Sequence, residues 1–388
     1  MEECSVVRVR ELNDIKDVAR LYEDWSSLLA STDNALFSTV EWITCWWKHF
    51  GNTRQMRVLV AEEDSQTVAI APLMLTEYKF MKFSKLRKIE FIGSPQSDYN
   101  SFILTENSSD CMRLFMKYLE SVKGWHYLEL RDVLEDSVSA RLLGDDSVTP
   151  PWKLEKRVLT LAPYIVLPPT FESLLSQLRR KLRREIARLE RRLKEDYQVE
   201  LKTYREFSSI NEAMDTVFEL HERRRRSVSD EPSAFATPQT RAFHNELAAS
   251  FAAKGWLNLN FLMADGEPIA AGYCFDYRGK TYAYQGGSDP RFDRYAVNTL
   301  LRLRVIEGSI QRGLREYDFL KGAERYKFNW PVQVRRSLAI NFVRPSFIAK
   351  VLWTAEKKRR QLGHLLRRSE ESQRIMQHAN ANLEDDEV

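Results

Sequence analysis

Two acidic residues in the second half of the chain each follow a segment with the composition of a strand. Asp289 comes after Thr281–Gln285, and Glu324 comes after Glu316–Leu320. Because the ends of neighbouring strands in an α/β sheet meet at one edge, we expect the two carboxylates to lie close together. A positioned carboxylate can take a proton from a reacting group, so both are candidate general bases. The structural alternatives are a turn-forming Asp before Pro290 and a carboxylate that stabilises a helix start.

The residues before Asp289 predict a meander of three strands. Apolar residues dominate the segments Leu257–Ala264, Pro268–Tyr277 and Thr281–Gln285. Asp265-Gly266 and Arg278-Gly279 separate these segments and are typical of hairpin turns. A helix from about Asn298 to Gly313 then leads to the strand Glu316–Leu320. Both candidate bases therefore follow strands of one predicted sheet.

The first half of the chain repeats this pattern at an offset of about 190 to 200 residues. The segments AIAPLM, FIGSPQSD and WHYLEL correspond to AAGYCF, YQGGSD and EYDFLK. In each half an acidic residue, Asp98 or Asp289, follows a glycine near the end of a strand, and a helix then leads to a short strand. Such a repeat indicates two copies of one domain, since a solenoid would repeat at a far shorter period. The predicted class is α/β (α+β), with two mixed, mostly antiparallel sheets flanked by helices.

Prolines mark the expected boundary between the two copies. The segment PPWKLEKRVLTLAPYIVLPPT is punctuated by prolines and predicts an extended crossing between domains. We therefore expect one domain over residues 1–167 and a second over residues 168–344. In residues 345–388, SFIAKVLWTAEKKRRQLGHLLRR predicts a basic helical extension, and ANLEDDEV predicts an acidic, disordered tail.

The composition excludes several classes of protein. The longest apolar run, Val68–Leu75, is far shorter than the roughly 20 residues that span a bilayer. The start MEECSVVRVREL lacks the features of a secretory signal, so we expect a cytoplasmic protein. The 4 cysteines and 6 histidines show no metal-ligand spacing, which predicts no bound metal. No P-loop, G-x-S-x-G or G-x-G-x-x-G sequence supports kinase, hydrolase or dehydrogenase chemistry.

Positive charge is concentrated in one segment, although the formal net charge of the whole chain is only +4. Nine Lys and Arg residues lie between Arg179 and Lys194, against Glu185 and Glu190. One apolar stripe of the predicted helix is formed by Leu178, Leu182, Ile186, Leu189 and Leu193. The cations therefore lie on the other faces, where they meet solvent, an anionic membrane or RNA.

A resemblance to a known family covers most of the chain up to about Arg344. It is carried by GKTYAYQGGSDPRFDRYAVNTLLRLRVIEGSIQRGLREYDFLKGAERYKFNW, in which D-F-L-x-G-x-E-x-Y-K spans Asp318–Lys327. This stretch, together with FSTVEWITCWWKHFG, VAIAPLML and FIGSPQSDY, resembles the CelD-type acetyltransferases, relatives of the FemAB transferases in the GNAT acyltransferase superfamily. The resemblance implies tandem GNAT-like domains with acyl-CoA, first of all acetyl-CoA, as donor. It places the donor in a cleft between the strand ending at Gln285 and the strand Glu316–Leu320.

The predicted donor site combines this resemblance with the physics of phosphate binding. The helix that begins near Asn298 offers free N–H groups and a partial positive charge to a pyrophosphate. The residues assigned to the donor are Gln285, Gly286, Gly287, Arg291, Arg294, Asn298 and Thr299. The related family often has glycine where Asn298 stands, and Asn tolerates unusual backbone angles better than most residues.

Acyl transfer to an amine needs a base, because an alkylamine with a pKa of about 10.4 costs about 4–5 kcal/mol to deprotonate at pH 7. The residues assigned to catalysis are Tyr326, Asp289 and Glu324. The resemblance implies that Tyr326 protonates the CoA thiolate, and the alternative is a packed surface tyrosine. Backbone N–H groups of Tyr282–Gln285 are the expected oxyanion donors. The residues assigned to the acceptor are Asp98, Asp318 and Lys327, of which Asp318 and Lys327 could instead pair with each other.

The acceptor itself stays open between an amine and a hydroxyl of a sugar, a polysaccharide precursor or a small amine. The resemblance links the family to exopolysaccharide, cellulose or cell-envelope synthesis at the inner face of the membrane. FemAB relatives use aminoacyl-tRNA, which the basic segment Arg179–Lys194 would suit, and an inactive scaffold on a membrane or nucleic acid is a further alternative. The first domain lacks D-F-L-x-G-x-E-x-Y-K, so we expect it to be non-catalytic and to shape the acceptor side. Acyl length and oligomeric state also stay open.

Overall fold

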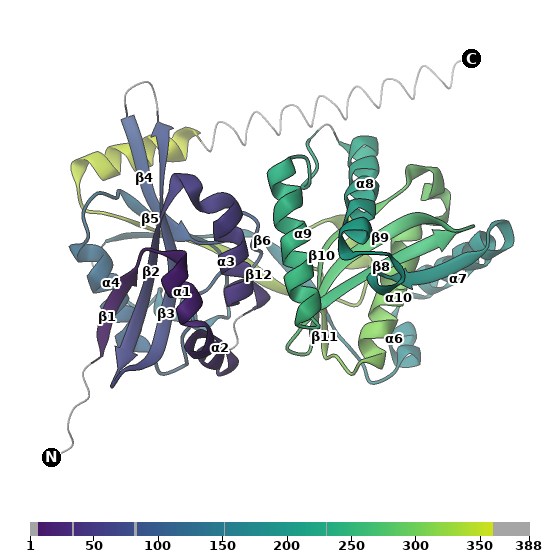
Figure 1. Ribbon diagram of the computed structural model, residues 1–388, viewed down its shortest axis with the longest axis horizontal. Coiled ribbons are helices and arrows are strands. Elements are labelled where there is room, and N and C mark those ends of the chain that lie inside the picture. Colours follow the sequence, from purple (N-terminus) through teal and green to yellow (C-terminus); the bar gives the residue numbers. More distant parts are fainter. Residues whose placement is uncertain (1–6, 33–34, 81–83, 151, 230, 360–388) are drawn as a thin grey trace.

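In the part of the chain that the structure describes, one continuous sheet of twelve strands runs through both halves (Figure 1). The computed structural model describes residues 7–32, 35–80, 84–150, 152–229 and 231–359. The strand order is β1-β2-β3-β4-β5-β12-β6-β11-β10-β9-β8-β7. Neighbouring strands are antiparallel except for the pairs β4–β5 and β10–β11, which are parallel. The predicted class of a mixed, mostly antiparallel sheet flanked by helices is confirmed.

The first half supplies five consecutive strands at one end of the sheet. They are β1 Arg8–Leu12, β2 Arg54–Glu63, β3 Gln66–Phe80, β4 Ser84–Phe91 and β5 Tyr127–Leu134. Its helices are α1 Ile15–Arg20, α2 Tyr22–Ala30, α3 Val40–Phe50, α4 Ser109–Ser121 and α5 Val138–Leu142. Thr39 caps α3 by accepting a hydrogen bond from the Trp42 N–H. Trp42 and Trp46 on α3 are fully buried, and their ring N–H groups donate to the side chains of Ser97 and Gln96.

The second half supplies the matching strands at the other end. They are β7 Val199–Thr203, β8 Leu257–Ala264, β9 Glu267–Tyr277, β10 Lys280–Ser288 and β11 Glu316–Asp318. Its helices are α6 Phe171–Gln177, α7 Arg180–Asp196, α8 Ile210–Val228, α9 Pro238–Ala253 and α10 Val297–Gln311. The predicted meander is present as β8, β9 and β10, with Asp265, Gly266, Arg278 and Gly279 all at positive φ in its turns. The predicted apolar stripe is shorter than expected, because Leu178 precedes α7 and ends α6.

Two strands are exchanged between the halves at the centre of the sheet. β6 Lys153–Val166 follows β5 in the chain but pairs with β11, and β12 Gln333–Val343 follows β11 but pairs with β5. β6 and β12 also pair with each other over eleven residue pairs. Each half thus has five strands of its own and a sixth from the other half. The predicted inter-domain crossing is the strand β6, which joins the two expected sheets into one. The domain boundary at residue 167 stays a prediction.

Helices α3 and α9 pack against each other and join the halves on one face of the sheet (Figure 1). The Trp42 and Phe243 rings meet edge to face with centroids 5.7 Å apart, within one apolar core that contains residues of both halves. A further helix over residues 347–359 follows β12, in line with the expected helical extension. The predicted acidic tail lies outside the described residues. In the part of the chain that is described, no helix combines the length and apolarity needed to cross a bilayer.

Candidate active site

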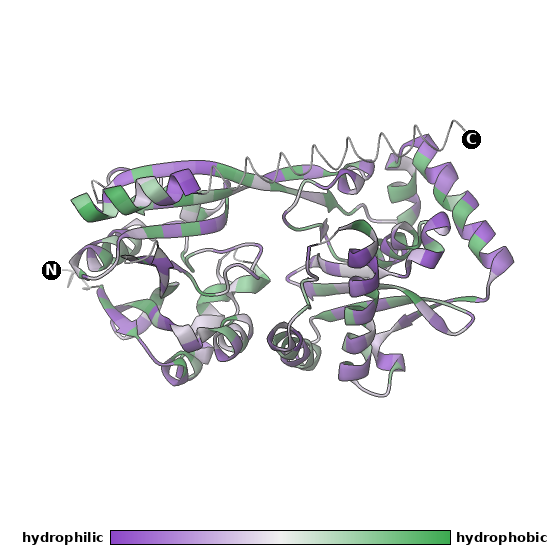
Figure 2. Ribbon diagram, turned by 90° about the horizontal axis from the view of Figure 1, so that it is seen from above, coloured by the Kyte–Doolittle hydropathy of each residue, from purple (hydrophilic) through white to green (hydrophobic). Residues whose placement is uncertain are grey.

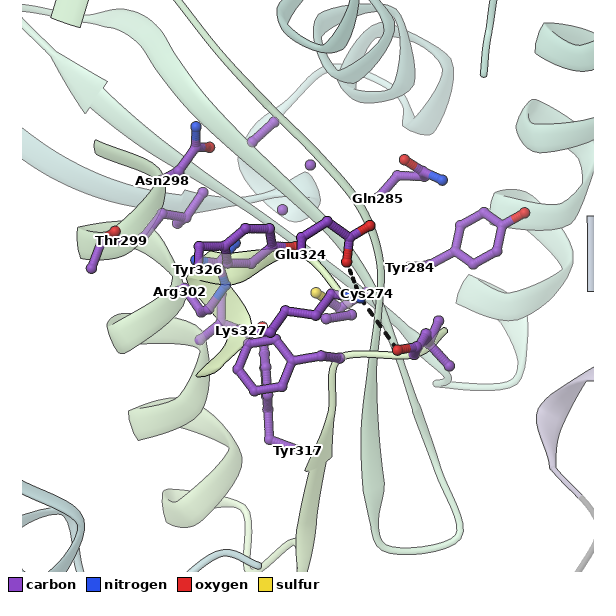
Figure 3. Close-up of a pocket in the computed structure, with 18 of the residues that line it drawn as sticks. Cys274, Tyr284, Gln285, Asn298, Thr299, Arg302, Tyr317, Glu324, Tyr326 and Lys327 are labelled. Atoms are coloured by element: carbon purple, nitrogen blue, oxygen red, sulfur yellow. Dashed lines mark hydrogen bonds and ion pairs between the residues drawn. The ribbon is translucent and has the colours of Figure 1, made fainter. Parts of the chain in front are cut away.

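The parallel strands β10 and β11 separate after a short paired stretch. Lys280–Tyr282 pairs with Glu316–Asp318, where β11 ends, but β10 continues to Ser288. The register of β10 against β9 also shifts between Ala283 and Gln285, which is a β-bulge. Beyond this point the space between the two strands is a cavity of about 710 Å³ (Figure 3). The sequence placed a donor cleft at this position.

The N-terminus of α10 forms one wall of the cavity. Ala296, Val297, Asn298 and Thr299 all line it. Among the described residues no side chain caps this helix, and its first turn holds no acidic residue, so the partial positive charge of the helix end faces the cavity. Ala296 precedes the helix at φ 49°. The unusual backbone angle expected at Asn298 is therefore found at Ala296, because the helix begins at Val297 and Asn298 is already helical.

Four of the seven residues assigned to the donor line the cavity: Gln285, Gly286, Asn298 and Thr299. Gly287 instead packs against α8, since a Cβ atom there would lie 2.2 Å from the backbone nitrogen of His221. Arg291 and Arg294 are outside the set of lining residues. Arg291 is paired with Asp289, and the Arg294 guanidinium donates to the Tyr295 hydroxyl at 2.6 Å.

Asp289 is held in ion pairs outside the cavity lining. Its carboxylate lies 2.8 Å from Arg291 and 2.7 Å from Arg223. It also caps the next turn by accepting from the Arg291 N–H at 3.0 Å. The hydrogen bonds from Arg291, reinforced by Arg223, lower the pKa of Asp289 to about 2. A carboxylate with this pKa is a weak proton acceptor, so the geometry favours the turn-forming alternative over the role of base.

Glu324, Tyr326 and Lys327 line the cavity on the segment after β11 (Figure 3). The Lys327 side chain is buried and its Nζ lies 2.9 Å from Glu324 Oε2. The same Nζ donates to the carbonyl oxygens of Leu320 and Lys321 at 3.3 Å and 3.0 Å. The Tyr326 ring lies under the Arg302 guanidinium, at 4.5 Å from its centroid. Tyr326 is 44% exposed, and the partial burial of its side chain raises the pKa of its hydroxyl, which stays protonated at neutral pH.

Asp98 reaches this cavity from the first half of the chain. It lines the cavity, is 9% exposed and lies 3.3 Å from Lys321 Nζ. Burial raises the pKa of Asp98 to about 6, the Lys321 charge opposes this rise, and Asp132 adds to it. The sequence assigned Asp98 to the acceptor. Its position and its pKa near neutrality also give it the properties of a general base.

Asp318 lies behind the cavity and does not pair with Lys327. It accepts hydrogen bonds from the Tyr99 hydroxyl at 2.8 Å and the Leu320 N–H at 2.7 Å. Arg335 lies 3.4 Å from it, and burial raises its pKa to about 7. The suggested Asp318–Lys327 pair is thus wrong. The Asp318 side chain points from β11 toward β12 and the first half, whereas the Lys327 side chain contacts the segment that follows β11. Asp318 has a structural position at the junction of the halves.

The sequence missed several residues of the cavity wall. The basic ones are Arg224, Arg302 and Lys321, and the others include Cys274. Arg302 follows Asn298 by four residues, so a helical wheel of α10 would have placed both on one side. Lys321 shows no such signal, because its partners Asp98 and Asp132 are about 190 to 220 residues away in the chain.

The structure brings one group of metal-binding residue types together, although the sequence predicted no metal ligands. Cys45 and His49 on α3 and Glu246 on α9 place their ligand atoms within 4.8 Å of one another. Glu246 already lies 2.8 Å from both Lys48 Nζ and His49 Nε2. Burial and the Glu246 charge raise the pKa of the Cys45 thiol to about 12. A cation would have to displace Lys48, so this group is better explained as an ion-paired contact between the two helices.

Comparison with protein families identifies the part of the chain that builds this cavity. Residues 180–328 match the family described as an acetyltransferase (GNAT) domain. This range includes the bulged strand β10, the helix α10 and the segment that carries Glu324, Tyr326 and Lys327. A comparison with curated proteins finds no match. This part of the chain is therefore similar to GNAT acetyltransferase domains, while the match to the narrower CelD type stays a resemblance.

Similar solved structures cover nearly the whole chain. FemX has a TM-score of 0.60 and 10% identity over 89% of this chain and 99% of its own. L-PGS from Bacillus licheniformis has a TM-score of 0.52 and 9% identity over 86% and 96% of the two chains. The C-terminal domain of a putative lysylphosphatidylglycerol synthetase from Agrobacterium fabrum has a TM-score of 0.51 and 11% identity over 88% and 96%. At these identities the likeness establishes a shared FemX-like fold.

Proposed function

We propose that the cavity between β10 and β11 binds an acyl-CoA, first of all acetyl-CoA, and that the protein transfers the acyl group to an amine or hydroxyl. The observation that carries this proposal is the separation of two parallel strands directly beside an uncapped helix N-terminus. The pyrophosphate of CoA would accept hydrogen bonds from the first turn of α10. Asn298, Thr299 and Arg302 line the cavity beside that turn and would add polar and charged contacts.

The pantetheine arm would extend along β10, where the bulge interrupts the regular pairing with β9. The register shift between Ala283 and Gln285 leaves Tyr284 without a directly opposed residue on β9. An N–H group of β10 in this stretch would stabilise the oxyanion of the transfer step. The Tyr284 hydroxyl is anchored by donating to the carbonyl oxygen of Gln96 at 3.0 Å, which fixes the strand at this point.

Proton transfer is assigned to three groups around the cavity. Asp98, with a pKa of about 6, accepts the proton of the attacking amine or hydroxyl, directly or through water. Tyr326 donates a proton to the departing CoA thiolate. Glu324, which is held by Lys327, orients the acceptor or shares the role of base. The base assignment thus moves from Asp289 to Asp98.

The acceptor meets the donor at the junction of the two halves. Asp98 comes from the first half and lines a cavity that is otherwise formed by residues of the second. This arrangement supports a first domain that shapes the acceptor side without a donor site of its own. The acceptor class remains an amine or hydroxyl of a sugar, a polysaccharide precursor or a small amine, in exopolysaccharide, cellulose or cell-envelope synthesis. The enzyme would act in the cytoplasm, at the inner face of the membrane where such precursors are assembled.

A titration of the purified protein with acetyl-CoA tests the donor site. The Asn298→Asp variant places a carboxylate in the second position of α10, against the pyrophosphate, and is expected to weaken binding by about 10-fold or more. Asn211→Asp is the matched control, because Asn211 is exposed and holds the second position of α8. Loss of binding in Asn298→Asp with normal binding in Asn211→Asp supports the assignment. Failure of the unmodified protein to bind any acyl-CoA at millimolar concentration refutes it and leaves the aminoacyl-tRNA and inactive-scaffold hypotheses.

A second candidate donor is aminoacyl-tRNA, which α7 favours. The cations of this helix face outward while Ile186, Leu189 and Leu193 are buried, so a basic surface is presented to solvent. The FemX-like fold is compatible with this alternative. Binding of RNA that falls steeply with salt, and that is lost in Arg184→Gln/Arg188→Gln, would favour it. An anionic membrane is the rival partner for this surface.

A further inference from the structure

The helix over residues 347–359 packs against the first half through one of its faces. Ala349 and Trp353 are 1% and 5% exposed and pack against Leu86 and Tyr127 of the sheet. The Trp353 and Tyr127 rings lie 4.9 Å apart. At the end of the helix, Lys357 Nζ lies 3.1 Å from a carboxylate oxygen of Glu155 on β6. The helix is therefore a docked element whose orientation is defined.

The opposite side of this helix exposes large apolar residues next to cations. Phe347, Ile348 and Val351 are 82%, 64% and 49% exposed. Lys350 and Lys358 are also exposed, and among the described residues neither forms an ion pair with a carboxylate. Figure 2 shows the hydrophobic residues gathered at the outer end of the helix. We refer to these five residues as the 347–358 face.

We propose that the 347–358 face docks on an anionic phospholipid bilayer, with the helix lying in the plane of the interface. An interfacial helix inserts apolar side chains at the level of the headgroups while its Lys residues meet anionic lipids. Phe347, Val351 and Lys358 follow one another at helical spacings of four and seven residues, so they share one stripe. This inference is independent of the acyl-CoA proposal.

A second copy of the chain fits this face less well than a bilayer does. A two-fold interface would bring Lys350 and Lys358 of two copies toward each other, and like charges destabilise such contact. Three exposed apolar side chains also offer far less than the roughly 800 Å² per partner of a stable interface. A bilayer has neither the charge repulsion nor the small contact area of a second copy, because its anionic headgroups complement the cations and its hydrocarbon region accommodates the apolar side chains.

The basic helix α7 provides a natural contrast. Its apolar residues Ile186, Leu189 and Leu193 are 4%, 6% and 1% exposed, so α7 presents charge without exposed apolar groups. Charge alone gives attraction that salt screens, whereas inserted apolar groups persist at high salt. The two helices thus predict different kinds of membrane contact, and variants of each can distinguish them.

Flotation of the full chain with vesicles tests this proposal. Vesicles of phosphatidylcholine alone are compared with vesicles of equimolar phosphatidylcholine and phosphatidylglycerol. The unmodified protein is expected to float only with the anionic vesicles. Phe347→Ser/Ile348→Ser/Val351→Ser and Lys350→Glu/Lys358→Glu are each expected to weaken binding about 10-fold or more. The α7 variant Arg184→Gln/Arg188→Gln is the control and is expected to bind normally. All five altered positions of the face are exposed, and an unchanged melting temperature would verify that the variants fold.

Three outcomes overturn the proposal. The first is the absence of vesicle binding by the unmodified protein. The second is a serine variant that binds anionic vesicles normally, above all if the α7 variant loses binding, because α7 would then be the membrane contact. The third is a dimer of the unmodified protein, seen by size-exclusion chromatography with light scattering, that the serine variant converts to a monomer. In that case the occupant of the face is a second copy.

Discussion

The parallel pairs β4–β5 and β10–β11 occupy equivalent places in the two halves, but the space beyond them is used differently. In the first half the chain after β4 returns to the sheet, where Ile103 bridges to Ile70, and Phe102 packs against Phe91 with ring centroids 5.2 Å apart. In the second half the chain after β10 leads directly into α10, whose N-terminus lines the cavity. Side chains fill the first position, and a cavity bordered by a helix end occupies the second.

The acidic residues that follow the two strands differ in the same way. Asp98 is buried beside Lys321 and has a pKa of about 6, whereas Asp289 is held by Arg291 and Arg223 and has a pKa of about 2. Equivalent positions in a repeated sequence can therefore carry opposite chemistry. The number of cationic partners and the degree of burial decide which carboxylate remains available to accept a proton.

The largest effect is expected from Asp98→Asn. If Asp98 is the base, this variant loses acyl transfer by about 10²–10⁴-fold while its affinity for acetyl-CoA stays within about twofold. Turnover with an amine or hydroxyl acceptor, together with an acetyl-CoA titration, measures the two quantities. Normal turnover in Asp98→Asn would instead favour Glu324 as the base. Turnover of the Glu324→Gln variant would then test that assignment.

The pH dependence of the same variant sharpens this assignment. Activity of the unmodified protein is expected to rise through about pH 6 and then level off, because Asp98 must be ionised to accept a proton. Asp98→Asn should lose this rise. A rise that persists in the variant would show that another group titrates.

Gly287→Ala is expected to destabilise the second half by about 2–4 kcal/mol, because its Cβ atom would meet the backbone of α8 at 2.2 Å. Gly286→Ala is the matched neighbour, with a closest contact of 3.2 Å to the Ala271 carbonyl oxygen, and is expected to cost less. Urea unfolding of both variants gives the comparison. Equal losses of stability in the two variants would mean that α8 can shift away from β10 at little cost.

Asp289→Asn is expected to lower stability by about 1–2 kcal/mol at pH 7 and to leave acetyl-CoA binding unchanged. Because the folded pKa of Asp289 is depressed, its contribution is present above the unfolded pKa of about 3.9 and is lost as the pH falls toward 2. The stability difference between the variant and the unmodified protein should therefore shrink between about pH 4 and pH 2. Loss of turnover without loss of stability would instead place Asp289 in the reaction.

The smallest effect is expected from Lys321→Met. Lys321 lowers the pKa of Asp98, so its removal should move the rise of activity to higher pH by up to about one unit. The pH profile of turnover measures this shift. A profile that moves to lower pH, or does not move, would show that Lys321 does not lower the pKa of Asp98.

Individual helices, strands and turns could be predicted from the sequence, because each depends on residues that are close together in the chain. Asp-Gly and Arg-Gly turns between apolar segments predicted the meander β8–β10, and the helix expected from about Asn298 to Gly313 is present as α10. β6, β7 and β12 were not predicted as strands. β6 carries exposed charged residues on both sides, so the alternation that marks a half-buried strand is weak there.

The sequence by itself determined the repeat, the order of strands around the candidate site and the residue types on the segment that holds Glu324, Tyr326 and Lys327. The tertiary structure alone decided that β6 and β12 change places, and that Asp98 and Lys321 meet across the junction of the halves. The physical reason is that turn and helix preferences act within a few residues. Burial and charge pairing, which set a pKa and open a cavity, depend on residues that only the folded chain brings together.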